Sequence, residues 1–143
     1  MTNDYPVHVA GLGLRRGLIV QLMANRPVDD DFMEVAPENW LNVGVILGRK
    51  FRWFTERYPF VLHGLSLSIG APSPLNESLL RDIRKFMDVH GIEFYSEHLS
   101  YCGDDGQLYD LMPIPFTEDA VKHVAGRIRR AQDILGRRMA VEN

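Results

Sequence analysis

The chain has 143 residues, 45% of them hydrophobic and 24% charged, which is the balance of an ordinary globular protein and not of a disordered one. The net charge is −3, and Lys and Arg are scattered among Asp and Glu, so no basic stripe predicts binding to nucleic acid. The single cysteine, Cys102, excludes an internal disulfide and fits a reducing, cytoplasmic compartment, and nothing in the sequence predicts an export signal or a membrane span.

Short β-like runs that end in polar residues alternate with longer stretches of helical apolar spacing. The first run, Val7–Leu14, ends in Gly-Leu-Gly-Leu-Arg and precedes a predicted helix over Gly17–Asn25. The second run, Phe32–Ala36, ends in Pro-Glu-Asn, and apolar residues at helical spacing then continue until Pro59. Those residues are Val43, Ile46, Leu47, Phe51 and Phe54.

The third run covers Phe60–Gly70 and leads to the clearest helix signal in the chain. Asn76 is the predicted N-cap, with Leu75 and Leu80 as its hydrophobic staple. Gly91 is a suitable left-handed residue to end the helix, and we expect His90 to contact the last carbonyls. The predicted buried stripe is Leu79, Leu80, Ile83, Phe86 and Met87.

The fourth run, Ile92–Leu99, leads into a predicted loop that contains Gly and Asp. Thr117 is expected to cap a further helix, with Phe116 and Val121 as its staple, and Gly136 to end it. The fifth strand then begins within residues 138–143. The predicted buried stripe of the last helix is Val121, Val124, Ile128, Ala131 and Leu135.

Consecutive βα units of this kind require a parallel sheet. A dinucleotide-binding sheet would need GxGxxG, but the third glycine position is occupied by Arg16. Polar residues recur instead at the carboxyl ends of successive strands, where the active sites of (β/α) barrels assemble. The predicted fold class is therefore α/β, a TIM barrel, with residues 1–143 as the N-terminal part of one domain and about four and a half βα units present.

Three strand ends carry residue types that bind metals: His63, His98 and Glu142. One strand-end histidine is usually a hydrogen-bonded structural residue, but recurrence at three successive strands favours a metal site. Two imidazoles and a carboxylate suit iron, zinc or manganese. Because adjacent strand residues point to opposite faces, Glu97 should point away from His98, which is the preferred ligand. The residues expected to share the ligands' face are small or apolar: Val61, Ser96 and Ala140.

Other polar residues near the strand ends have two open interpretations each. Arg15 follows a glycine-rich strand end and is suited either to hold a carboxylate or phosphate or to pair with an acidic neighbour. Ser66 is suited to bind substrate or backbone, and the backbone is favoured. Glu34 and Glu38 flank the end of the second strand, and His123 is expected to be structural.

Six motifs in chain order, from about residue 9 to the last residue, resemble one known family, the multinuclear non-haem iron-dependent oxidative enzymes, which include the methanobactin-biosynthesis enzyme. They are Gly-Leu-Gly-Leu-Arg (11–15), Glu-Val-Ala-Pro-Glu-Asn-Trp (34–40), His-Gly-Leu-Ser-Leu-Ser-Ile-Gly (63–70), Ser-Glu-His-Leu-Ser-Tyr (96–101), Asp-Leu-Met-Pro-Ile-Pro-Phe-Thr (110–117) and Val-Glu-Asn (141–143). The resemblance implies a barrel of the xylose-isomerase type with two or three iron ions. It also implies dioxygen as cosubstrate and ribosomally made precursor peptides as substrate, often modified at cysteine and presented by a partner protein.

By this resemblance His63, His98 and Glu142 match the family's first iron ligands. Residues expected to support these ligands or contact substrate are Arg15, Glu34, Glu38, Asn39, Ser66, Glu97 and Asn143. A complete barrel needs eight strands and roughly 250 residues, and later strands of the family supply further ligands. We therefore expect this chain to be inactive alone.

Two other functions are compatible with the same residues. One is a divalent-metal sugar isomerase or epimerase, which would use similar ligands without redox chemistry. The other is a non-catalytic half-barrel that associates with itself or with another chain through exposed strand edges.

Overall fold

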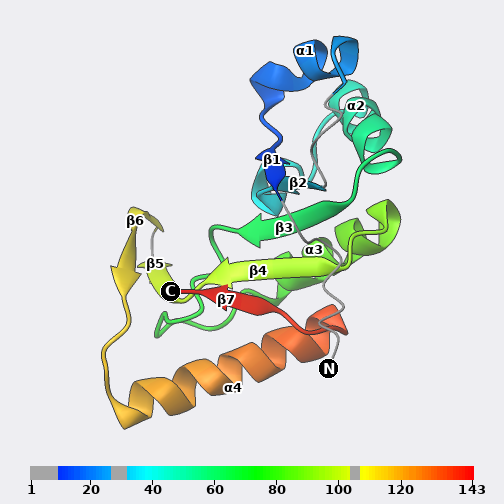
Figure 1. Cartoon of the computed structure of the whole chain (residues 1–143). Coiled ribbons are helices and arrows are strands. Elements are labelled where there is room, and N and C mark those ends of the chain that lie inside the picture. Colours follow the sequence, from blue (N-terminus) through cyan, green and yellow to red (C-terminus); the bar gives the residue numbers. More distant parts are fainter. Residues whose placement is uncertain (1–9, 27–31, 104–106) are drawn as a thin grey trace.

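The computed structural model describes residues 10–26, 32–103 and 107–143. They form an α/β fold whose main sheet has five parallel strands in the order β1-β2-β3-β4-β7 (Figure 1). This order follows the chain, as expected for consecutive βα units, and confirms the predicted parallel sheet. The strands are β1 (Gly11–Gly13), β2 (Phe32–Val35), β3 (Phe60–Gly64), β4 (Phe94–His98) and β7 (Ala140–Glu142).

The predicted helices are present between the strands. The first begins as a 3-10 turn, η1 (Arg16–Leu18), and continues as α1 (Ile19–Ala24). Residues 7–9 of the predicted first strand lie outside the described part of the chain. Among the residues that the structure describes, no helix has the length and apolar character needed to cross a membrane. The remaining helices are η2 (Pro37–Asn39), α2 (Val45–Thr55), α3 (Glu77–His90) and α4 (Glu118–Leu135).

The ends of α3 and α4 form as the sequence predicts. The Asn76 side chain accepts a hydrogen bond from the backbone N–H three residues later, at 3.1 Å, and Thr117 does the same for α4 at 3.2 Å. Gly91 and Gly136 end these helices with φ values of 65° and 69°, a left-handed conformation that glycine adopts without a Cβ clash. Local sequence therefore determines where both helices begin and end.

Helix α3 lies against the sheet behind β3 and β4 (Figure 1) and supplies much of the core. Its Leu80, Ile83 and Met87 are fully buried in one cluster with Leu62 of β3 and Tyr95 of β4. Burial of each aliphatic side chain contributes about 1.5–3 kcal/mol. The other two members of the predicted stripe, Leu79 and Phe86, are partly buried at its margin.

Three apolar residues of the predicted helical patterns are exposed. Ile46 is 75% exposed in α2, whereas Phe51 and Phe54 of the same helix are buried. Phe116 is fully exposed and Val121 is 62% exposed, so the expected staple of α4 does not form. Helical spacing fixes the face on which an apolar residue lies, but it does not specify whether a neighbouring element covers that face.

The segment predicted as a loop after β4 contains an antiparallel hairpin. Its strands are β5 (Ser100–Gly103) and β6 (Gln107–Pro113). Ser68 Oγ accepts a hydrogen bond from Cys102 N at 2.9 Å, and Ser100 O accepts one from Gly70 N at 2.9 Å. The hairpin is therefore fastened to the loop between β3 and α3, and Cys102 of β5 is buried.

Two further histidines have structural contacts. His123 Nε2 of α4 lies 2.9 Å from Ala71 O, so α4 holds the same β3–α3 loop, in line with the structural role expected for this histidine. His90 was expected to contact the last carbonyls of α3, but its Nδ1 lies 3.2 Å from the Thr55 hydroxyl of α2, and its ring packs edge-on against Phe51. His90 thus links α3 to α2.

Candidate metal centre

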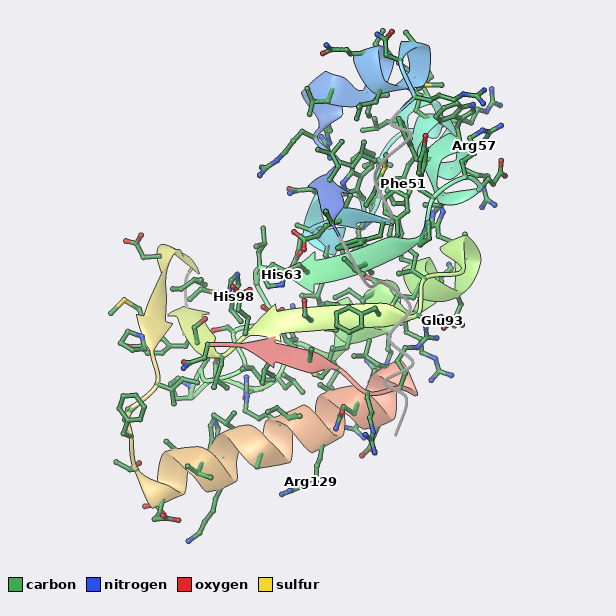
Figure 2. The ribbon with its side chains drawn as sticks, in the orientation of Figure 1. Phe51, Arg57, His63, Glu93, His98 and Arg129 are labelled. Atoms are coloured by element: carbon green, nitrogen blue, oxygen red, sulfur yellow. The ribbon has the colours of Figure 1, made fainter. Side chains whose placement is uncertain are left out.

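Strands β3, β4 and β7 are neighbours in the sheet, and their register aligns the three predicted ligands. His63 is paired with Ser96 of β4, and His98 of β4 is paired with Glu142 of β7. Because the strands are parallel, their carboxyl ends meet at the same edge. Figure 2 shows His63 and His98 side by side at that edge.

The polar atoms of these residues converge. His63 Nε2 lies 3.0 Å from His98 Nε2 and 3.0 Å from Glu142 Oε2, and the two rings meet edge to face with 4.4 Å between centroids. One possible ligand atom from each residue can be chosen so that all lie within 4.8 Å of one another. Two atoms bonded to one ion at about 2.1 Å and at right angles are about 3.0 Å apart, so the spacing fits a shared metal ion.

The cluster lies at the boundary between protein and solvent. The side chains of His63 and His98 are 17% and 19% exposed, whereas that of Glu142 is 60% exposed. Within the described ranges, it is the only group of three or more His, Cys, Asp or Glu residues whose possible ligand atoms lie this close together. The two histidines are thus partly enclosed by the sheet, and the Glu142 carboxylate faces solvent.

Glu97 does not join the cluster. Its side chain is buried on the opposite face of β4, where Oε2 accepts a hydrogen bond from the Tyr95 hydroxyl at 2.9 Å. Its Oε1 accepts one from His98 N at 2.9 Å, and Leu67 N lies 3.4 Å from Oε2. This is the orientation that strand alternation predicts, and it makes Glu97 a support for the backbone of His98.

Burial raises the pKa values of Glu97 and Tyr95. It raises the pKa of Glu97 to about 7, although the donated hydrogen bonds from Tyr95 and His98 act in the opposite direction. Burial, assisted by the nearby Glu97 carboxylate, also raises the pKa of the Tyr95 hydroxyl. Tyr95 therefore remains a hydrogen-bond donor to Glu97.

Glu38 and Ser66 meet beside the site. Glu38 Oε1 accepts hydrogen bonds from Leu65 N at 2.8 Å, from Ser66 N at 2.9 Å and from Ser66 Oγ at 2.9 Å. Its other oxygen, Oε2, is buried and has no hydrogen-bond partner among the described residues. The carboxylate from η2 therefore orders the start of the β3–α3 loop. The Ser66 hydroxyl bonds this carboxylate, and not the backbone group that was favoured from the sequence.

The other candidate residues lie at the surface. Arg15, Glu34 and Asn39 are exposed, and no hydrogen bond or ion pair within the described residues joins them to the cluster. Asn39 instead accepts a hydrogen bond through its carbonyl from the guanidinium of Arg16, a contact that the sequence did not suggest. Asn143 is exposed next to Glu142.

Gly64, at the end of β3, leaves room for this buried pair. A Cβ there would lie 2.5 Å from the Tyr95 hydroxyl and closer still to Glu97 Oε2. We predict that Gly64→Ala lowers the free energy of unfolding by about 1–3 kcal/mol in urea denaturation, because the buried groups must move. Gly126→Ala, in open space within α4, is the matched control and should stabilise by up to about 1 kcal/mol. Equal stability of Gly64→Ala and the wild type would refute the steric argument.

The raised pKa of Glu97 predicts a pH dependence of stability. Between pH 4.5 and about 7 the folded chain keeps a proton on Glu97 that the unfolded chain releases, so stability falls as the pH rises through this window. Across this pH window, the free energy of unfolding of the wild type should fall by about 3 kcal/mol relative to that of Glu97→Gln. Urea denaturation with a chelator present measures both values. Glu93→Gln, at an exposed carboxylate on the same segment, controls for loss of one charge. If the free energies of unfolding of Glu97→Gln and the wild type differed by the same amount at every pH, the raised pKa of Glu97 would be contradicted.

Comparison with known sequences places this geometry in a family. The sequence model of the RiPP precursor modification enzymes MbnB/TglH/ChrH matches residues 9–143. A UPF0276 protein of Nitrosospira multiformis is 62% identical over 133 residues, covering 93% of this chain and 47% of the relative. A UPF0276 protein of Pseudomonas aeruginosa is 59% identical, covering 94% and 47%, and one of Alcanivorax borkumensis is 53% identical, covering 100% and 50%.

The chain thus spans about half the length of the curated relatives that it matches. The family match covers all three residues of the cluster and the strands that carry them. The chain belongs to the family of RiPP precursor modification enzymes MbnB/TglH/ChrH.

Proposed function

We propose that this chain forms the N-terminal part of an iron- and dioxygen-dependent enzyme that oxidises residues, often cysteines, of ribosomally made precursor peptides. The observation that carries the proposal is the convergence of His63, His98 and Glu142 in a chain of this family. The family acts on RiPP precursors, which supports a peptide as substrate. A separate protein that presents the precursor to the enzyme is part of the proposal.

The donor set fits iron. His63 and His98 would supply imidazole nitrogens and Glu142 a carboxylate oxygen, a combination that leaves further coordination positions open. Bound iron would supply the activation of dioxygen. The protein would hold the imidazoles on β3 and β4, while the exposed Glu142 carboxylate would compensate positive charge on the open side.

The sheet supports a barrel of which this chain supplies part. Five parallel strands in chain order are the repeating pattern of a (β/α)₈ barrel, which contains eight such strands. We propose that residues 1–143 form the N-terminal part of one TIM-barrel domain and that the remaining ligands come from the later strands. A reducing compartment, the cytoplasm, is proposed from the single cysteine, Cys102.

The edge of the described sheet at β7, with an apolar groove beside it, is suited to contact another chain. Strands β1 and β7 are each paired on one side only. Beside β7, a cavity of about 330 Å³ is lined mainly by apolar side chains, including Leu99, Phe116, Val121 and Val124. An open strand edge next to an apolar groove favours association, so we propose that the chain alone self-associates when the rest of the barrel is missing.

A sugar isomerase or epimerase is the second candidate for the same ligand set. It would use the same three residues to hold a divalent metal without redox chemistry. The family match favours the peptide oxidation, and the dependence on dioxygen separates the two reactions.

Metal binding tests the ligand set. In anaerobic calorimetric titration with Fe²⁺, we predict that His63→Ala, His98→Ala and Glu142→Ala each weaken binding at least tenfold, about 1.4 kcal/mol, because each removes a ligand atom. His123→Ala is the control, since His123 contacts Ala71 O and not the cluster. Equal affinity of the ligand variants and His123→Ala would reject the site.

Oxygen consumption with a Cys-containing precursor peptide tests the reaction with the same protein. We expect none from the 143-residue chain alone, because later ligands are missing, and consumption after co-expression with the second half of the Nitrosospira multiformis relative. Turnover by the chain alone would contradict the first expectation. Oxygen-independent sugar isomerisation with Mg²⁺ or Mn²⁺ by the combined halves would favour the second candidate.

The association proposal predicts a concentration-dependent increase in mass. In sedimentation velocity, the wild type should form dimers or larger species, and Val121→Asp should shift it toward the monomer by adding charge to the groove. Val89→Asp, at an exposed site on α3, is the matched control and should associate like the wild type. A monomeric wild type at all concentrations would exclude self-association.

A further inference from the structure

Ser96 lies directly behind one of the proposed ligands. It is the register partner of His63 across β3 and β4, and its Oγ lies 2.8 Å from His63 Nδ1. The same Oγ lies 3.4 Å from the carbonyl oxygen of Leu62. His63 thus has a protein partner on one ring nitrogen, while the other faces His98 and Glu142.

The two contacts of Ser96 assign the donor in each. A carbonyl oxygen only accepts, so the contact with Leu62 uses the single hydroxyl proton of Ser96. Ser96 Oγ then accepts from His63 Nδ1–H. A neutral imidazole with its proton on Nδ1 carries its lone pair on Nε2, the atom 3.0 Å from both Glu142 Oε2 and His98 Nε2.

We propose that Ser96 is a positioning residue that holds the His63 ring with Nδ1–H toward β4 and presents Nε2 to the metal. The inference rests on the proposed metal site, but the hydrogen bond itself belongs to the protein. In water the free histidine side chain favours the tautomer with its proton on Nε2, which blocks the ligand atom. A fixed acceptor at Nδ1 removes that competition and prevents the ring from turning over.

The arrangement also explains why a small polar residue stands at this position. Ser96 is on the same face of β4 as His98, between β3 and β7, and is paired with Ala140 as well as with His63. Serine supplies a hydroxyl at hydrogen-bonding distance with the least volume.

Zn²⁺ is a suitable probe because it is diamagnetic and accepts the same ligands. We expect Ser96→Ala to weaken Zn²⁺ binding by about 10–100-fold, as measured by competition with a chromophoric chelator. Ser96→Thr retains the hydroxyl and should restore most of the affinity. Ser78→Ala removes an exposed hydroxyl on α3 and should bind like the wild type.

A second readout reports the tautomer and not merely the stability. In ¹⁵N-resolved spectra of the Zn²⁺-loaded wild type, His63 should show a slowly exchanging Nδ1–H, which Ser96→Ala loses and Ser96→Thr keeps. Wild-type affinity and an unchanged Nδ1–H signal in Ser96→Ala would overturn the role of Ser96 while leaving the ligand set intact. Failure of His63→Ala to affect Zn²⁺ binding would instead reject the proposed site.

Discussion

The parallel register of β3, β4 and β7 is the constraint on which the candidate site depends. His63 and Ser96 are level across one strand pair, and His98 and Glu142 are level across the next. A slip of one residue in either pair would turn one member of the cluster to the opposite face. The register is in turn fixed by the apolar side chains of α3, which pack against Leu62 and Tyr95 on the other side of the sheet.

Two acidic residues organise the backbone around the cluster without entering it. Glu38 binds the amides of Leu65 and Ser66, and Glu97 binds the amide of His98 and approaches that of Leu67. Glu38 through Oε1, and Glu97 through both oxygens, therefore satisfy N–H groups that the end of a strand leaves unpaired. Conformational freedom in the loop is reduced just where the first histidine must be held.

Much of the fold was predictable because its signals are local. The caps at Asn76 and Thr117 and the left-handed Gly91 and Gly136 each depend on a few neighbouring residues. Strand alternation likewise predicted that Glu97 points away from His98, toward the side where it is buried. These features need no information about distant parts of the chain.

What could not be predicted depends on contacts between distant segments. The hairpin of β5 and β6 is fastened to Ser68 and Gly70, some thirty residues earlier, whereas the Gly and Asp residues of this part of the sequence gave only a loop signal. The exposure of Phe116 and Val121 depends on which element covers α4. Ser96 had been placed on the ligands' face, but its bond to His63 required the register of two strands.

The buried position of Cys102 has a consequence for selectivity. The residue is only 6% exposed, and its Sγ lies 3.9 Å from the carbonyl oxygen of Leu65, at the point where β5 packs against the β3–α3 loop. A thiol enclosed in this way is poorly accessible to solvent and to small oxidants. Under the proposed function, this enclosure would shield the one thiol of the chain from the reaction, so that an incoming peptide thiol would meet no competitor from these residues.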